Sequence, residues 1–312
     1  MLPRAHSLVV FTLALTAVIP AFGGKSVIKV GSYNLFASVA RKRVIAKNTD
    51  VSPQRYWCHS ARSVARMLDE QDCDIISLQE VCDSISGARG EFGVKEWLPA
   101  GKYSWILYPG SSTSIVYDCA IVYKPSRLTC LQSGVFWTGG YPLEPRSDLG
   151  LGAAMPCVWA LMKDRKNGKR FYFLSVHLNS NPQKLRFNAQ QFVDFAHRTL
   201  VPPGIPSIVA GDLNCDRGHY TDVFLDCLMA SRWQDAWQTL REEGALPKEE
   251  RQVGTMNAKN DSSLSRWRPD HILYDGFIPL DFHTDRRKLP TTDGSLHYPS
   301  DHLPVTCIVR FK

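Results

Sequence analysis

Short runs of apolar residues recur along the chain, and most of them end in small groups of polar residues. The runs are rich in Val, Ile, Phe and Tyr, which favour strands. They predict strands over residues 27–35, 74–78, 103–108, 118–124, 127–137, 157–163, 170–177, 207–210, 270–274, 278–283 and 303–311. Residues 54–70 and 183–200 instead carry apolar side chains at helical spacing, and further helical segments are expected near 220–229 and 233–243.

The order of these elements predicts an α/β fold. Asn167-Gly168 separates two strand-like runs and indicates a hairpin with a two-residue turn. Other strands are joined through helices, so a wholly parallel sheet is not expected. Two packed mixed sheets with helices outside accommodate both patterns. The chain shows no internal repeat or linker, which indicates one folded domain.

The N-terminus has the pattern of a secretory signal. Arg4 precedes an apolar stretch at residues 7–19, and small residues follow up to Gly24. Thirteen apolar residues fall short of the ~20 of a membrane span, and no later stretch approaches that length. We therefore expect a signal peptide at 1–23 and a domain at 24–312 that is secreted, lumenal or periplasmic, with no stable membrane insertion. An uncleaved anchor is the alternative.

All nine cysteines follow the predicted signal, so at least one of them is unpaired or bonded between chains. Their spacing does not match a zinc site. In an oxidising compartment, Cys73–Cys82 and Cys215–Cys227 are locally possible disulfide bonds, although sequence alone cannot fix the pairing.

The formal net charge is +7 at pH 7. Removing residues 1–23, which contain Arg4, would leave +6. This balance favours a polyanionic partner only slightly. The densest basic stretch, Lys163–Arg170, surrounds the predicted hairpin turn and is more typical of a solvated hairpin than of a nucleic-acid patch.

Polar clusters lie where the buried strands should stop or start, which is where α/β folds build their sites. These clusters are Tyr33-Asn34, Gln79-Glu80, Ser175-Val176-His177, Gly211-Asp212-Leu213-Asn214, Arg268-Pro269-Asp270 and Ser300-Asp301-His302. Each alone has an ordinary structural explanation, such as a turn, a helix cap or a packed histidine. Together they supply what hydrolysis of a phosphate ester with a hard cation requires.

The chemistry suggests a division of roles. Magnesium usually takes one or two carboxylates from the protein, and Glu80 with Asn34 fits that demand. His302 is the natural base, because an unperturbed pKa of ~6.5 leaves it partly neutral near pH 7. Asp270 could fix the tautomer of His302.

In order and composition, these six motifs resemble the endonuclease/exonuclease/phosphatase superfamily. The resemblance spans nearly the whole chain after the signal. It implies a four-layer α/β sandwich, with two packed mixed β-sheets flanked by helices, and hydrolysis dependent on Mg²⁺ or Mn²⁺. The implied metal-binding residues are Asn34, Glu80 and Asp301. The implied catalytic residues are His177, Asp212, Asn214, Asp270 and His302. The resemblance does not decide whether Asp212 or His302 is the general base, or whether one or two metal ions take part.

Departures from the motifs of individual subfamilies indicate which branch of the superfamily the chain resembles. Phe36 stands where abasic-site endonucleases carry an acid, and those enzymes lack a histidine equivalent to His177. The chain is therefore more similar to the deoxyribonuclease and sphingomyelinase branch, although Cys82 replaces a DNA-contacting Arg of the pancreatic-type enzymes. Candidate substrate-binding residues are Arg186, Trp267 and Arg268.

We therefore expect a monomeric, secreted phosphoester hydrolase, with a nuclease-type phosphodiesterase as the first choice. The long loops 138–156 and 284–300 hold few bulky apolar residues for entering a membrane, and Arg286–Lys288 suits a phosphate backbone, so nucleic acid is favoured over lipid. The alternatives are a sphingomyelinase-like enzyme or a sugar- or inositol-phosphate phosphatase, and more remotely a non-catalytic binding protein on the same scaffold.

Overall fold

The structure is a computed structural model that describes residues 26–36, 53–82, 94–108, 116–139, 155–257, 266–290 and 296–312. The predicted signal peptide at 1–23 lies outside these residues. Within them, no helix is both long and apolar enough to cross a lipid bilayer.

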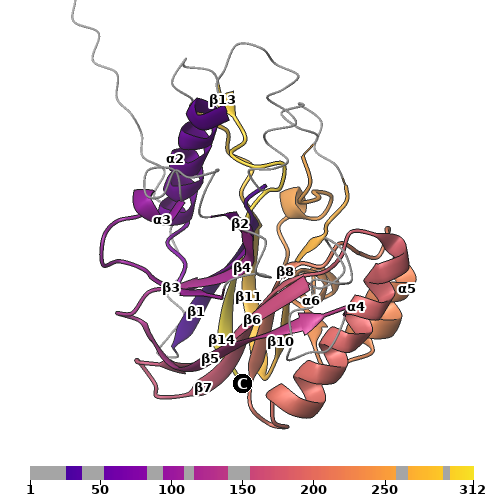
Figure 1. Cartoon of the computed structure of the whole chain (residues 1–312). Helices are drawn as coiled ribbons and strands as arrows, with labels where there is room; N and C mark the ends of the chain where they lie inside the picture. Colours follow the sequence, from indigo (N-terminus) through magenta and orange to yellow (C-terminus); the bar gives the residue numbers. More distant parts are fainter. Residues whose placement is uncertain are drawn as a thin grey trace, which may run out of the picture.

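Two six-stranded sheets form the centre of the molecule (Figure 1). The first contains, in spatial order, β11 (Phe277–Thr284), β14 (Val305–Phe311), β1 (Val27–Asn34), β2 (Ile75–Cys82), β4 (Val116–Tyr123) and β3 (Ser104–Leu107). The second contains β5 (Leu128–Thr138), β6 (Met155–Asp164), β7 (Arg170–His177), β8 (Ser207–Asp212), β10 (Asp270–Asp275) and β9 (Gln234–Asp235). A small separate pair joins β12 (Leu289–Pro290) to β13 (Leu296–His297). Both large sheets are mixed, because β1 runs parallel to β2 and β7 runs parallel to β8, whereas the other pairs are antiparallel.

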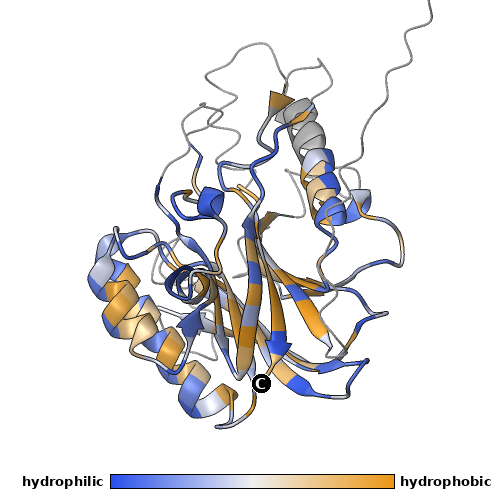
Figure 2. Cartoon of the chain, turned by 180° about the vertical axis from the view of Figure 1, so that it is seen from behind, coloured by the Kyte–Doolittle hydropathy of each residue, from blue (hydrophilic) through white to orange (hydrophobic). Residues whose placement is uncertain are grey.

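Helices flank the two sheets. They are α2 (Pro53–Gln71), α3 (Val94–Trp97), α4 (Pro182–Phe195), α5 (Thr221–Val223) and α6 (Ala236–Glu242), with shorter helical turns η1 (Ala196–Leu200), η2 (Phe224–Met229) and η3 (Lys248–Glu250). In Figure 1, α2 lies on the side of the first sheet and α4 on the side of the second. Figure 2 shows hydrophobic colour concentrated in the strands and in bands along α4.

Three groups of buried apolar side chains follow this layering. The central group joins the facing surfaces of the two sheets, for example Val30 of β1 with Phe173 of β7 and Ile272 of β10. A second group lies between α4 and the second sheet, and a third lies between α2 and the first sheet. The predicted fold class, two packed mixed sheets with helices outside, is confirmed.

Most expected elements are present, but the turn at Asn167-Gly168 differs. Asp164 and Lys169 are joined by a backbone hydrogen bond of 2.9 Å, so four residues form the loop instead of two. Gly168, with φ of 74°, adopts the left-handed conformation, and Asn167 instead accepts the N–H of Lys169 through its side chain. The hairpin prediction is right and the predicted turn length is wrong.

The expected disulfide bonds are wrong. All seven cysteines whose side chains the structure describes are free thiols, including Cys73, Cys215 and Cys227. Cys73 and Cys82 lie near opposite ends of β2, so at about 3.3 Å per residue their Cα atoms are roughly 25–30 Å apart, far beyond the ~7 Å limit for a bridge. The Sγ atom of Cys227 instead lies 3.8 Å from the Arg186 guanidinium.

Gly211 allows β7 and β8 to approach closely where the site begins. The parallel register pairs Val176 with Gly211 and then His177 with Asp212. A Cβ atom on Gly211 would lie 1.8 Å from the backbone oxygen of Val176. The strands could not keep this spacing with any larger residue, so the glycine of the Gly-Asp-Leu-Asn motif positions His177 beside Asp212.

We predict that Gly211→Ala lowers the free energy of unfolding by more than about 2 kcal/mol, since the added methyl group must displace backbone. Urea unfolding measures the change. Gly218→Ala is the matched control, because its Cβ would meet its nearest described neighbour at 3.4 Å, an ordinary contact. Equal stability of the two variants would contradict the close approach of β7 and β8.

Candidate active site

Polar side chains from both sheets meet around the carboxylate of Asp212, at the end of β8. In the second sheet, Asp212 pairs in register with His177 of β7 on one side and with Asp270 of β10 on the other. Asn34 ends β1 in the facing sheet. We call the resulting group the Asp212 cluster, which consists of Asn34, Glu80, His177, Asp212, Asp270 and His302.

A single oxygen of Asp212 connects three of these side chains. Its Oδ2 atom accepts a hydrogen bond from Asn34 Nδ2 at 3.0 Å. The same oxygen lies 3.6 Å from His177 Nε2 and 3.7 Å from His302 Nε2. Because the Asp212 side chain is almost wholly buried, water screens these charges little.

His302 is held by Asp270 as the sequence predicts. The ring Nδ1 lies 2.8 Å from Asp270 Oδ2, which leaves Nε2 directed at Asp212. Thr255 donates its hydroxyl to the same Asp270 oxygen at 2.5 Å. Ser300 also donates its hydroxyl to the backbone oxygen of Asn34 at 2.7 Å, which ties the last motif to the end of β1.

His177 has a carboxylate partner that the sequence analysis missed. Its Nδ1 lies 2.8 Å from Asp118 Oδ1, and the same oxygen accepts the backbone N–H of Glu80 at 3.3 Å. Asp118 lies near the start of β4 and is the one charged residue of that strand, VYDCAIVY, which is the signal that the sequence offers. The structure adds local strain: Glu80 and Asp118 both have positive φ, of 54° and 58°, beside a register shift between β2 and β4.

A buried hydrogen-bond network supports the cluster from below. Ser77 of β2 donates to the backbone oxygen of Ala210 in β8 at 2.7 Å, and its hydroxyl also lies 2.7 Å from that of Ser175 in β7. Gln79 then donates its side-chain amide to Ser77 at 2.6 Å. These contacts join the two sheets just beneath the site, so both sets of strand ends are held in fixed relation.

The carboxylates strongly alter both histidines. Burial disfavours the charged form of His302, but Asp270, followed by Asp212 and Asp301, outweighs it and raises the pKa of His302 to about 10. Burial likewise opposes the charge on His177, but Asp118, Asp212 and Glu80 raise the pKa of His177 to about 10. The expectation of a partly neutral His302 near pH 7 is therefore wrong for the protein without a bound cation.

The cluster fits a hard divalent cation. Asn34 Nδ2 lies within hydrogen-bonding distance of both Glu80 Oε1, at 3.2 Å, and Asp212 Oδ2, at 3.0 Å, so two carboxylates share one small region. The buried Oδ1 atom of Asp270, a further carboxylate oxygen of the cluster, has no hydrogen-bond partner among the described residues. Oxygen donors of this kind suit magnesium or manganese.

The structure also brings together a group of possible ligand atoms that the sequence analysis does not assign to the metal. Among the described residues, Asp212, Asp270 and His302 have ligand atoms within 4.8 Å of one another. The sequence instead predicts Asn34, Glu80 and Asp301. Because the Asp270–His302 hydrogen bond already occupies one nitrogen, the oxygen-rich side of the cluster near Asp212 and Glu80 is the better match for a hard cation.

The remaining predicted residues occupy different surroundings. Asn214 is buried, has a positive φ of 50°, and donates its amide to the backbone oxygen of Leu178 at 2.8 Å. Asp301 adjoins His302, and the Ser300 hydroxyl lies 3.4 Å from its carboxylate. The functions of these two residues stay predictions.

The three candidate substrate-binding residues do not join the Asp212 cluster through any described contact. The half-exposed Arg186 pairs with Asp222 and Asp226 on the outer helices. Trp267 packs near His219, with ring centroids 5.4 Å apart. The buried Arg268 donates to the backbone oxygen of Val253. A role in substrate binding is a prediction for all three.

The chain belongs to the endonuclease/exonuclease/phosphatase family, whose model matches residues 31–302. The match includes every residue of the Asp212 cluster. No curated protein sequence matches the chain. Membership makes this protein a relative of phosphoesterases that typically use divalent metals.

Solved structures share the fold at low sequence identity. A family member from Bacteroides thetaiotaomicron has a TM-score of 0.72 at 20% identity and covers 92% of this chain and 96% of its own. A mannosyl-6-phosphatase from the same species gives 0.70 at 21%, covering 91% and 100%. D. rerio TDP2 complexed with a single-strand DNA product gives 0.64 at 18%, covering 91% and 99%.

We predict that Asp118→Asn lowers the pKa of His177 from about 10 toward the ordinary ~6.5, because the variant removes the largest charge that favours the imidazolium. Histidine NMR titration in EDTA measures this. Under the same conditions the pKa of His302 should stay high, and Asp222→Asn, at the surface, should change neither histidine. An unaltered His177 titration in Asp118→Asn would disprove the pairing.

Proposed function

We propose that this protein is a divalent-cation-dependent phosphoester hydrolase that acts at the Asp212 cluster. The observation that carries the proposal is the convergence of two histidine–carboxylate pairs, Asp270–His302 and Asp118–His177, on the one buried carboxylate of Asp212. Two histidines that each have a carboxylate partner and both lie near Asp212 can supply a general base and a general acid, which ester hydrolysis needs.

Glu80 and Asp212, aided by Asn34, would hold the cation, with Mg²⁺ or Mn²⁺ as the candidates and Asp301 completing the shell. When bound, the cation would neutralise phosphate oxygens and, by adding positive charge among the carboxylates, favour the neutral form of His302.

His302 Nε2 is the proposed acceptor of the proton from the attacking water, because Asp270 fixes its ring through Nδ1. His177, with its raised pKa, carries positive charge at neutral pH and would bind the phosphate or protonate the leaving oxygen. Asn214 would help to orient the phosphoryl group from the loop after β8.

For substrate, we propose a phosphodiester in nucleic acid. The support is the net positive charge, +7 for the whole chain and +6 without residues 1–23, and the fold similarity to TDP2 with its single-strand DNA product. The basic residues Arg286–Lys288 contribute less to binding a phosphate backbone than the sequence suggests. Arg287 already pairs with Asp285 and Glu70, and Arg286 pairs with Glu250.

A sugar phosphate is the second candidate, and the fold similarity to the mannosyl-6-phosphatase favours it.

We also propose that the protein is exported after removal of residues 1–23 and acts as a monomer. The N-terminal sequence of the exported protein tests the removal of residues 1–23, since an intact Met1 would refute it. The molecular mass measured by sedimentation equilibrium tests whether the protein is a monomer.

We predict that His302→Ala reduces the rate of hydrolysis by ~10²–10⁴-fold, the typical contribution of general-base assistance. Circular dichroism and thermal melting confirm that the variant is folded. His283→Ala is the control, because His283 is an exposed histidine on β11 that pairs with Glu250. A folded His302→Ala variant with near-wild-type turnover would exclude His302 as the base.

Glu80→Gln should raise the magnesium concentration needed for half-maximal activity by at least tenfold, because the change removes a hard anionic ligand and preserves shape. The activity is titrated with Mg²⁺ after treatment with EDTA. Glu96→Gln alters an exposed glutamate of α3 and should leave the titration unchanged. If the Glu80→Gln curve overlaid that of the wild type, the cation would have to bind elsewhere.

The substrate proposal predicts hydrolysis of single-stranded DNA or RNA in preference to sphingomyelin liposomes and mannose 6-phosphate at matched Mg²⁺. Nuclease activity should fall as salt rises, because phosphate contacts release counterions. Turnover of mannose 6-phosphate with inert nucleic acid would favour the second candidate. Turnover of liposomes alone would place the enzyme with lipid hydrolases.

A further inference from the structure

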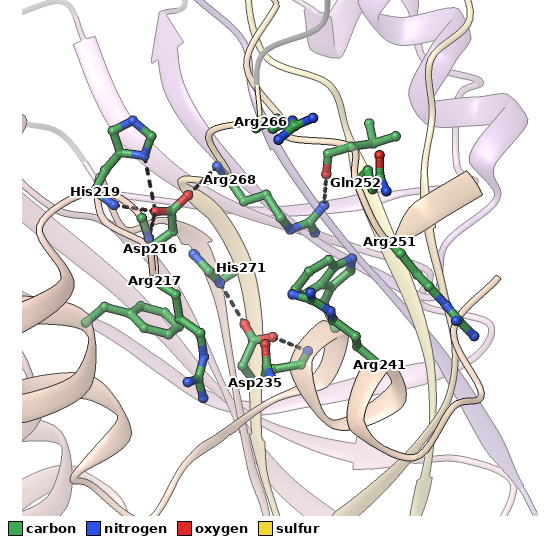
Figure 3. A pocket seen from close by; sticks show the side chains of 15 residues that line it. Asp216, Arg217, His219, Asp235, Arg241, Arg251, Gln252, Arg266, Arg268 and His271 are labelled. Carbon is green, nitrogen blue, oxygen red and sulfur yellow. Dashed lines mark hydrogen bonds and ion pairs between the residues drawn. The ribbon is translucent and has the colours of Figure 1, made fainter. Parts of the chain in front are cut away.

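A cavity of about 430 Å³ is lined by Asp216, which follows Asp212 in the loop after β8, and by His271, which follows Asp270 in β10. It is bounded by the loop that follows β8, by α6, and by the segments 251–253 and 266–268 (Figure 3). No residue of the Asp212 cluster lines it. Its volume falls within the range of about 300–1,000 Å³ typical of small-molecule sites.

Cationic side chains dominate this cavity. Figure 3 shows arginines on several sides of it, contributed by separate parts of the chain. They are Arg217, Arg241, Arg251, Arg266 and Arg268. Among the described residues, two carboxylates, Asp216 and Asp235, line the same space. Arg217 pairs with Glu242 at 4.0 Å, and the Arg251 guanidinium donates to the backbone oxygens of Leu246 and Gly244. The described lining still carries more positive than negative charge before the histidines are considered.

Neither carboxylate is directed at an arginine side chain. The oxygens of Asp216 accept three backbone N–H groups at 2.6–2.8 Å, which shape the loop after β8 and fix residue 268. Asp235 accepts from the ring of His271 at 2.6 Å and from a backbone N–H in the first turn of α6 at 2.7 Å. Both acids are thus occupied by the fold itself.

Within the part of the chain that the structure describes, Arg268 is a buried cation without an ion-pair partner. The residue is only 6% exposed, and the guanidinium donates one described hydrogen bond, from Nη1 to the backbone oxygen of Val253 at 2.7 Å. The guanidinium carbon lies 4.5 Å from the ring centroid of Trp237 and 5.3 Å from that of Phe282. The Nε and Nη2 atoms have no hydrogen-bond partner among the described residues.

The charge on Arg268 persists at neutral pH. Burial lowers the pKa of its guanidinium to about 10, against the raising effect of Asp235, Glu250 and Asp270 at longer range. A buried charge that lacks a bonded counter-ion is unfavourable and is normally paired in folded proteins. An anion in the cavity would satisfy the free donors of Arg268.

We propose that this cavity binds the phosphate monoester group of a small molecule. Guanidinium groups recognise phosphate through paired N–H donors, and a dianion with three acceptor oxygens suits several arginines at once. The same chemistry could come from inorganic phosphate released by hydrolysis or from an intact organic phosphate. The inference does not depend on the proposed hydrolytic activity.

Isothermal titration calorimetry in EDTA tests this site, because without a cation the carboxylates of the Asp212 cluster should repel phosphate. The probes are inorganic phosphate, glucose 6-phosphate and glucose. We expect one site per chain for each phosphate and no binding of glucose. Tighter binding of glucose 6-phosphate than of inorganic phosphate would identify an organic phosphate as the ligand, and equal or weaker binding would identify inorganic phosphate.

Arg268→Met should weaken phosphate binding at least tenfold, while its thermal midpoint without phosphate stays equal to or above that of the wild type, because an unpaired buried charge is removed. Arg241→Met, at a more exposed position, should weaken binding as well and serves if the first variant does not fold. Arg165→Met, on the β6–β7 hairpin, should bind like the wild type.

The proposal fails if the wild type binds neither phosphate in EDTA. It also fails if Arg268→Met and Arg241→Met bind normally while His302→Ala abolishes binding, because the ligand would then occupy the Asp212 cluster.

Discussion

The structure depends on one buried negative charge, the carboxylate of Asp212, shared among groups from both sheets. One oxygen receives the amide of Asn34 from the first sheet and lies within 4 Å of the rings of His177 and His302. In a low-dielectric setting, such a charge is stable only when well paired. The cluster solves this by charging both histidines, and each histidine is in turn fixed by its own carboxylate.

This arrangement explains why the motifs are far apart in sequence yet act together. Parallel pairing of β7 with β8, and antiparallel pairing of β8 with β10, bring His177, Asp212 and Asp270 side by side. The antiparallel pairing of β14 with β1 brings the C-terminal motif to Asn34. The buried Ser77–Ser175 contact then locks one sheet against the other. The site is thus a consequence of sheet register more than of any single loop.

Sequence could predict the parts of this site that end apolar runs. His177 and Asp212 end their strands, Glu80 lies near the end of β2, and His302 shortly precedes β14, so the hydrophobic pattern places all four near strand ends. Asp118 was not predicted, because its side chain is aimed by a register shift and a positive φ that leave no mark in composition. The pKa of His302 was also mispredicted, since it depends on carboxylates contributed by other strands.

The cavity lined by arginines illustrates a second limit. Arg268 belongs to a motif that indicates catalysis, yet its guanidinium packs against α6 and β11. The motif Arg268-Pro269-Asp270 places Asp270 in the Asp212 cluster, but the side chain of Arg268 points elsewhere. Only the three-dimensional structure shows this difference. The pairing of Cys73 with Cys82 fails because an extended strand separates residues that are close in sequence.

The central claim, that the charge of Asp212 organises both histidines, is tested most directly by Asp212→Asn, which keeps the shape and removes the charge. NMR titration of the folded variant in EDTA should give pKa values for His177 and His302 below about 10, and hydrolysis with Mg²⁺ should fall by at least ~10²-fold. Unchanged titration of both histidines together with near-wild-type turnover would contradict the account.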